Sequence, residues 1–209
     1  MPKYYPVYLD IESEKSVVVG GGEVAYRKAS GLKEAGSNVI VISPEFCDHF
    51  LKPNDLTLIK KRYEKGDIDG ATIVIASTND EETNKKVYTD ASEQNIPVNI
   101  VDQPDLCSFI VPSVIRRGDL CISISTGGTG PALAKSIRLS LEKHFGPEYA
   151  DYTELLSNMR QVVLSTIADG EKRRKILKRF AGNEFPEMIK NEGKQAAEKA
   201  MREIILSAK

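Results

Sequence analysis

The chain has 209 residues, of which 41% are hydrophobic and 28% charged, and its formal net charge at pH 7 is −1. These values are ordinary for a globular protein with one large domain or two smaller ones. The balanced charge argues against a protein that binds nucleic acid by broad electrostatic attraction. No apolar stretch approaches the length of about 18 residues that a membrane helix needs, so we expect no membrane partner.

The cysteines and histidines are few and scattered. Cys47, Cys107 and Cys121 form no C-x-x-C pair, and the only histidines are His49 and His144. This pattern predicts neither a disulfide framework nor a zinc site, and it is typical of a protein in the reducing cytoplasm. We therefore expect a cytoplasmic protein with no metal site, in which both histidines lie on the surface.

The first hundred residues alternate apolar runs with helical patterns. Strands are predicted at 15–21, 38–43, 56–62, 71–77 and 96–102, and helices at 23–36 and 79–95. Gly36 is expected to end the first helix, and Asn79 or Asp80 to cap the second. Several strands are continuous Val/Ile runs, which is typical of strands covered on both faces. The alternation predicts an α/β fold with a Rossmann-type parallel sheet.

The pattern changes after residue 108. Residues 108–126 predict two extended segments around a turn at Arg117-Gly118-Asp119, and a helix follows at 130–146, with Pro131 at its first position. From residue 147 only amphipathic helices are predicted, at 149–167, 170–182 and 193–208. We thus expect three parts: an α/β domain at 1–112, a β-hairpin and helix at 113–146, and an all-helical domain at 147–209.

Gly20-Gly21-Gly22-Glu23-Val24-Ala25 fits the pattern G-x-G-x-x-A between a strand and a helix. In such a turn the first glycine permits the bend, and Gly22 lets the backbone approach a pyrophosphate at the helix N-terminus. The second strand ends at Ser43-Pro44-Glu45, with no carboxylate before Glu45 and no arginine for a 2′-phosphate. The turn therefore predicts dinucleotide binding, and NAD is favoured over NADP.

Two classes of dinucleotide enzyme are excluded. No tyrosine is followed by a lysine four residues later, so the pair that short-chain dehydrogenases use is absent. The ligands of a zinc dehydrogenase are absent as well. A non-catalytic dinucleotide-sensing regulatory module, with the helical tail as a partner-docking surface, remains an alternative.

Three segments carry a resemblance to a known family. "VVVGGGEVAYRKASGLKEAG", "VNIVDQPDLCSFIVPSVI" and "LCISISTGGTGPALAKSIR" resemble the precorrin-2 dehydrogenase module of siroheme synthase, in its stand-alone form. The resemblance implies NAD-dependent oxidation of precorrin-2 to sirohydrochlorin by a homodimer, with 113–146 as the dimerisation segment. It also places Ser77 and Thr78 near the cofactor. Some members of the family insert ferrous iron as well, and the sequence leaves open whether this chain is a ferrochelatase.

Asp102 ends the fifth predicted strand, at the sheet edge where open α/β folds bind ligands. A partly buried carboxylate there could accept a proton, and the resemblance implies that Asp102 is the catalytic base. Two other interpretations stay open. Asp105 is a nearby competitor, and Asp102 could serve only to anchor Asn99 and Ser108.

The second glycine turn, Ser125-Thr126-Gly127-Gly128, also precedes a predicted helix. Successive free N–H groups in such a turn form an anion-binding nest. Because precorrin-2 carries carboxylates around its ring, these residues are expected to bind the substrate. The other interpretation is that the turn only reverses the chain.

Overall fold

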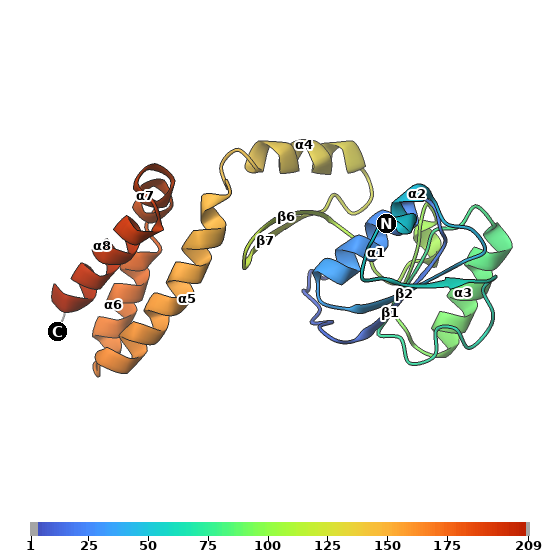
Figure 1. The fold of residues 1–209 in the computed structure, drawn as a ribbon, viewed down its shortest axis with the longest axis horizontal. Helices are drawn as coiled ribbons and strands as arrows, with labels where there is room; N and C mark the ends of the chain where they lie inside the picture. Colours follow the sequence, from blue (N-terminus) through green and yellow to red (C-terminus); the bar gives the residue numbers. More distant parts are fainter. Residues whose placement is uncertain (1–3, 208–209) are drawn as a thin grey trace. The chain divides into compact units, whose positions relative to one another are not determined.

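The computed structural model describes residues 4–207, and the chain divides into two compact units, unit 1 (Met1–Val111) and unit 2 (Pro112–Lys209). Figure 1 traces the elements of both. The outermost residues of the first and last predicted domains (1–3 and 208–209) lie outside the described residues. Residue 208, the predicted end of the last helix, is among them.

Unit 1 is built on a five-stranded parallel sheet, which confirms the predicted fold class. The strands lie in the order β3-β2-β1-β4-β5. Their bounds are β1 (Lys15–Val19), β2 (Asn38–Ser43), β3 (Thr57–Lys60), β4 (Ile73–Ala76) and β5 (Val98–Ile100). Each lies within a predicted run and all but β2 are shorter than predicted. The chain passes from β1 outward to β3 and then returns to β4, so the strand order reverses between β1 and β4.

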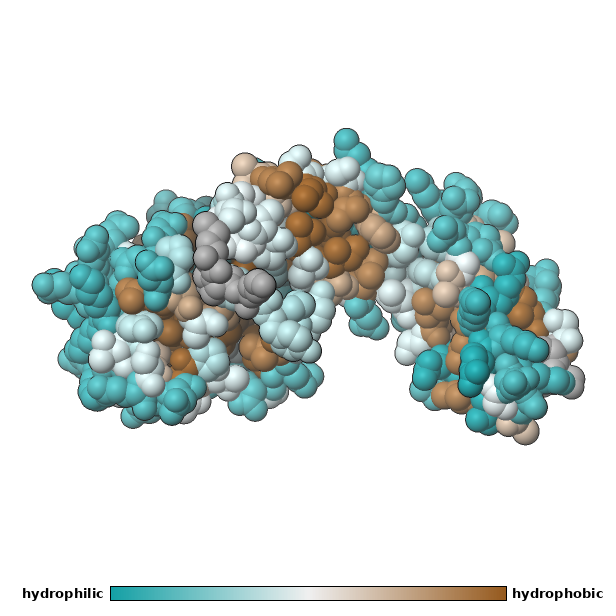
Figure 2. Space-filling view, turned by 180° about the vertical axis from the view of Figure 1, so that it is seen from behind, coloured by the Kyte–Doolittle hydropathy of each residue, from teal (hydrophilic) through white to brown (hydrophobic). Residues whose placement is uncertain are grey.

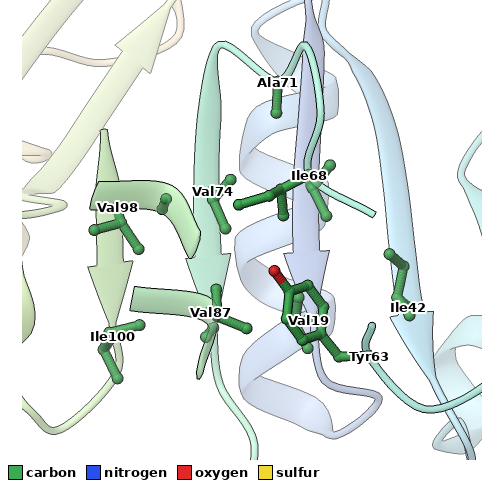
Figure 3. Packing of buried hydrophobic residues seen from close by; sticks show 12 residues of the cluster. Val19, Ile42, Tyr63, Ile68, Ala71, Val74, Val87, Val98 and Ile100 are labelled. Carbon is green, nitrogen blue, oxygen red and sulfur yellow. The ribbon is translucent and has the colours of Figure 1, made fainter. Parts of the chain in front are cut away.

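Helices cover both faces of this sheet, as the continuous apolar runs predict. On one face, Val18 and Val41 pack in a cluster with Ala25 and Ala29 of α1 (Glu23–Glu34) and with Phe50 of the short α2 (Asp48–Leu51). On the other, the strand residues pack against Val87 of α3 (Glu81–Glu93), as Figure 3 shows. Burial on both faces fixes the sheet rigidly and presents its carboxyl edge as a stable platform.

Of the helix ends predicted in unit 1, the Asp80 cap is confirmed, whereas α1 ends at Glu34, two residues before Gly36. Asp80 caps α3, with its carboxylate accepting a hydrogen bond from the N–H of Glu82 at 3.1 Å. Gly36 follows the end of α1 with a φ of +85°, a conformation that favours glycine. After β5 the chain makes one turn of 3₁₀ helix (Pro104–Leu106).

Unit 2 begins with the predicted hairpin. Strands β6 (Ser113–Arg117) and β7 (Leu120–Ile124) pair antiparallel around a two-residue turn in which Gly118 has a φ of +56°. Helix α4 (Pro131–Leu141) starts at Pro131 as predicted but ends five residues before Gly146. There, N–H groups of Lys143 and His144 bond three residues back instead of four, which tightens the helix into a turn.

Four helices complete unit 2: α5 (Glu148–Thr166), α6 (Gly170–Phe180), α7 (Glu184–Glu192) and α8 (Lys194–Ser207). Their buried side chains, among them Leu155, Phe180 and Met201, form one core. The all-helical tail is thus confirmed, and α7 is a helix that the sequence pattern did not predict. The boundary expected at 146 stays a prediction. Within residues 4–207, no helix has the length and apolarity to cross a membrane.

Candidate dinucleotide site

A cavity of about 560 Å³ opens at the carboxyl ends of the strands in unit 1. The ends of β1, β2 and β4 contribute Val19, Ser43 and Ser77 to its wall. The cavity therefore lies where the strand order reverses, the place at which open α/β sheets bind their ligands. Eight of the predicted cofactor-binding residues line it together: Gly20, Gly21, Gly22, Ser43, Pro44, Glu45, Ser77 and Thr78.

The three glycines of the turn have different physical roles. Gly20 has a φ of +130°, and a Cβ there would lie 2.7 Å from the carbonyl oxygen of Ser77. A Cβ on Gly21 would lie 1.8 Å from the carbonyl oxygen of Glu45, closer than two atoms can approach. A Cβ on Gly22 would meet nothing within 4 Å. Gly20 and Gly21 are thus required by the packing of the protein itself, whereas the space at Gly22 is open.

The first turn of α1 meets the requirements of a phosphate site. Gly22 is the N-cap residue and no side chain caps the helix. The first N–H groups of the helix, which include those of Glu23 and Val24, have no partner within the helix and carry its positive dipole end. Glu23 and Val24, the other two predicted cofactor-binding residues, do not line the cavity.

A buried hydroxyl supports the same assignment. Ser77 Oγ lines the cavity, is shielded from solvent, and has no hydrogen-bond partner among the described residues. A buried hydroxyl without a partner is costly, so its occurrence points to a ligand group that completes it. Asn84, which is 3% exposed, fixes the neighbouring loop by donating to the carbonyl oxygen of Thr78 at 3.0 Å. The residues present therefore fit a dinucleotide.

Arg62 is a cavity residue that the sequence interpretation missed. It follows β3, which pairs with β2, and it lines the cavity together with Ser43 and Glu45. The expectation that no arginine stands near the end of the second strand is therefore incomplete. The predicted strands already suggested this neighbour, because the usual order of such sheets places the third strand beside the second.

Asp102 lies outside the lining of the cavity, on the loop that follows β5. Its φ is +61°, an uncommon conformation for a residue other than glycine, and its side chain is exposed instead of partly buried. Within residues 4–207 its carboxylate has no hydrogen bond or ion pair. Asn99 instead donates to the carbonyl oxygen of Phe109 at 2.9 Å, and Ser108 Oγ accepts from the N–H of Val98 at 2.8 Å.

The Cys107 thiol holds the loop that carries Asp102. It donates toward the carbonyl oxygens of Ile100 at 3.2 Å and Gln103 at 3.3 Å. Burial raises the pKa of this thiol, which keeps it protonated and able to donate. The thiol thus ties Ile100, at the end of β5, to Gln103 beyond Asp102, and the Asp102 carboxylate takes no part in these bonds. The assignment of Asp102 as the catalytic base stays a prediction, and the partial burial expected of it is not found.

The second glycine turn lies in unit 2, before α4. Gly127 N–H donates to Ser125 Oγ at 3.0 Å, and Gly130 N–H donates to Thr126 Oγ1 at 3.1 Å. Thr129 N–H is also bonded inside the turn, to the carbonyl oxygen of Thr126. Several of the N–H groups expected to be free are therefore occupied. Those of Gly128 and of the uncapped first turn of α4 are left for an anion.

Three family models match successive parts of the chain. A putative NAD(P)-binding family covers residues 7–113, a sirohaem biosynthesis protein central region covers 117–144, and a sirohaem synthase dimerisation region covers 148–205. The first match alone spans about half of the chain and contains the whole cavity.

Similar proteins agree with these matches. The siroheme synthase of Methylobacillus flagellatus is 34% identical over 96% of this chain, and that of Vesicomyosocius okutanii is 38% identical over 82%. The chain spans only 44% and 37% of the lengths of these two relatives. A solved structure described as SirC, precorrin-2 dehydrogenase, has the same fold, with a TM-score of 0.76, 22% identity, and coverage of 96% of this chain and 100% of its own.

The glycine turn, the cavity above it and the order of the matched regions agree with one another. The chain therefore belongs to the putative NAD(P)-binding family, and the matched NAD(P)-binding region precedes the matched central and dimerisation regions.

Proposed function

We propose that this protein oxidises precorrin-2 to sirohydrochlorin with NAD as the electron acceptor. The observation that carries the proposal is the cavity at the strand-order reversal, with an uncapped helix N-terminus behind Gly22. The names of the relatives and of the structural neighbour support the choice of substrate.

Groups at the carboxyl edge of the unit 1 sheet would hold the dinucleotide. The N–H groups at the start of α1 would bind its pyrophosphate across the open space at Gly22. Glu45 is the carboxylate of the cavity nearest in sequence to the end of β2, where the adenosine ribose binds in such folds, and this favours NAD. Ser77 and Thr78 would face the other ribose. When bound, the dinucleotide accepts the hydride that leaves the tetrapyrrole.

Asp102 would take the proton that the same oxidation releases. Loss of a hydride and a proton removes two hydrogens from precorrin-2, so a base beside the hydride acceptor balances the reaction. Asp102 follows β5, which pairs with β4, and the residues after β4 line the cavity. Its strained backbone and free carboxylate are features that proteins retain at functional sites.

We further propose that Ser125, Thr126, Gly127 and Gly128 contribute to the binding of substrate carboxylates. We also propose that the protein acts in the cytoplasm and as a homodimer. Figure 2 shows hydrophobic side chains gathered over α4 and the hairpin, where Val114, Leu133 and Leu139 are exposed by 36%, 58% and 47%. Such a patch is expected to be covered in an oligomer. The match of 148–205 to a dimerisation region supports the same assembly.

The proposal is tested by incubating the purified protein with precorrin-2 and either NAD or NADP. We expect NADH absorbance and the sirohydrochlorin spectrum to appear together, with NAD the better acceptor. Binding of dinucleotide without any turnover would contradict the proposal and favour the regulatory sensing module.

Asp102→Asn is the first variant to test, because it removes the base while preserving the shape of the side chain. We expect turnover to fall on the order of 100-fold, the size of a general-base contribution. NAD affinity should stay unchanged, since Asp102 does not line the cavity. Asp105→Asn is the matched control and should keep its rate. If Asp102→Asn turned over precorrin-2 as fast as Asp105→Asn does, the base would have to lie elsewhere.

A further inference from the structure

Three side chains that can bind metal ions meet beside the glycine turn, in the described part of unit 1. They are Glu23, Cys47 and His49, and one ligand atom from each lies within 4.8 Å of those of the others. Glu23 is the first residue of α1, Cys47 is the N-cap residue of α2, and His49 is the second residue of α2. The cluster therefore joins two segments that are more than twenty residues apart in the sequence.

The backbone and neighbouring rings hold these side chains in place. Cys47 N–H donates to the carbonyl oxygen of Gly21 at 2.8 Å, which ties α2 to the residues just before α1. The ring of His49 stacks on that of Tyr26, with centroids 5.3 Å apart and planes inclined by 23°. Tyr26 in turn packs edge-on against the buried Phe50. The ligands are thus supported by packed elements of the sheet-and-helix core.

The carboxylate and the imidazole already face each other. His49 Nδ1 lies 2.8 Å and 2.7 Å from the two carboxylate oxygens of Glu23. The Cys47 thiol also hydrogen-bonds to the Glu23 carboxylate, so the three side chains already converge on one point.

One sulfur, one nitrogen and one oxygen ligand select a narrow class of metal ions. Zn²⁺ and Co²⁺ accept such mixed sets in tetrahedral geometry, whereas Mg²⁺ and Ca²⁺ require oxygen ligands throughout. Three protein ligands leave a fourth position open to water. Both side chains of the ion pair are accessible, with His49 46% and Glu23 62% exposed, so an ion can enter without unfolding.

We propose that Glu23, Cys47 and His49 form a binding site for a divalent ion of the zinc class. On binding, the thiol loses its proton to solvent, and the Glu23–His49 hydrogen bond is exchanged for bonds from both residues to the metal. The sequence predicted no metal site because its cysteines form no paired motif, and this cluster arises only when α1 and α2 pack together. The site adjoins the dinucleotide cavity, because Cys47 lines that cavity and Glu23 is the first residue of α1.

The test is a titration of the full chain, without a polyhistidine tag, by Co²⁺ and then by Zn²⁺. We expect Co²⁺ to produce a thiolate-to-cobalt charge-transfer band with one equivalent bound, and Zn²⁺ to abolish it by displacement. Cys47→Ser should remove the band, and His49→Gln should weaken Zn²⁺ affinity on the order of 100-fold, since loss of even an outer-shell partner costs 10–100-fold.

The controls are Cys121→Ser and His144→Gln, which remove the same residue types elsewhere and should bind as the original chain does. Circular dichroism checks that each variant is folded. If Cys47→Ser does not fold, Glu23→Gln serves as the second ligand variant. The proposal is overturned if no band forms, or if the band survives in a folded Cys47→Ser protein. No dinucleotide or tetrapyrrole is present, so failure of the proposed enzymatic function would leave this result unaffected.

Discussion

At the scale of single residues, neighbouring glycines in one turn are required for different reasons. Gly21 is required because its α-carbon faces the carbonyl group of Glu45, and any side chain would push the 43–47 segment away. Gly22 is surrounded by open space, so nothing in the described protein demands a glycine there. The fold is the reason for Gly21, whereas in the proposed function the pyrophosphate would be the reason for Gly22. The two effects can be separated experimentally.

The pair Gly21→Ala and Gly22→Ser makes that separation. We expect Gly21→Ala to lower the free energy of unfolding by about 1–3 kcal/mol, the usual cost of overpacking. Gly22→Ser should keep or raise stability, because serine is a good N-cap residue, yet it should weaken NAD binding at least about tenfold, roughly 1.4 kcal/mol. Denaturant unfolding and calorimetric NAD titration measure the two quantities. A Gly22→Ser protein that binds NAD normally would contradict the phosphate assignment.

At the scale of elements, one helix of unit 2, α6, is capped by a side chain. Asp169 is the N-cap residue of α6, and its carboxylate accepts from the N–H of Lys172 at 2.7 Å. This hydrogen bond lowers the pKa of the Asp169 carboxyl below its ordinary value of 3.8. A carboxyl whose pKa is depressed in the folded state stabilises that state above its ordinary pKa. The contribution is lost as the pH falls through the lowered pKa.

We therefore expect Asp169→Ala to lower the melting temperature by a few degrees at pH 7, with the difference shrinking as the pH falls below 3.8. Asp169→Asn keeps a capping oxygen without a titrating group. It should retain most of the stability at pH 7, and its melting curve should lack this pH dependence. Melting curves followed by circular dichroism between pH 7 and the acid range check the prediction. An equal loss in both variants at every pH would rule out the cap as the cause.

Elements with a strong periodic pattern were predictable from the sequence. The Val/Ile runs of β1, β2 and β4 identify buried parallel strands, and Asp80 and Gly36 mark the ends of two helices. Helix α7 was missed because it has nine residues and carries a proline in its first turn. The early end of α4 depends on local hydrogen bonding that no residue type in the sequence indicates.

The residues of the candidate site also fall into those that the sequence predicts and those that only the fold brings together. The glycine turn and the residues at the end of β2 were predictable because each adjoins a strand in sequence, whereas Ser77 and Thr78 were placed by the family resemblance. Arg62 reaches the cavity only through the lateral order of the strands, and the Glu23–Cys47–His49 cluster only through the packing of α1 with α2. The exposure of Asp102 and the internal bonding of the 125–128 turn are likewise properties of the fold, which residue spacing does not encode.

At the scale of the whole molecule, the groups of the dinucleotide cavity all belong to unit 1. The lining residues run from Val19 to Thr83, and the sheet cores on both faces are complete within the same unit.

We expect residues 1–111, expressed alone, to bind NAD within about threefold of the full chain's affinity, a difference of roughly 0.7 kcal/mol. The same fragment should not turn over precorrin-2. Calorimetry of the fragment checks the first statement, with its Gly22→Ser form as the control. A folded fragment that binds no NAD would show that unit 2 completes the site.

The boundary between Val111 and Pro112 is crossed by the backbone a single time. A gene fusion at this point needs one junction, so unit 1 of this chain can be joined to the region of a siroheme synthase that aligns with unit 2 without designing a return loop. Hybrids of that kind show which unit determines coenzyme preference and which unit determines oligomer formation. Each trait is expected to follow the parent that donated the corresponding half.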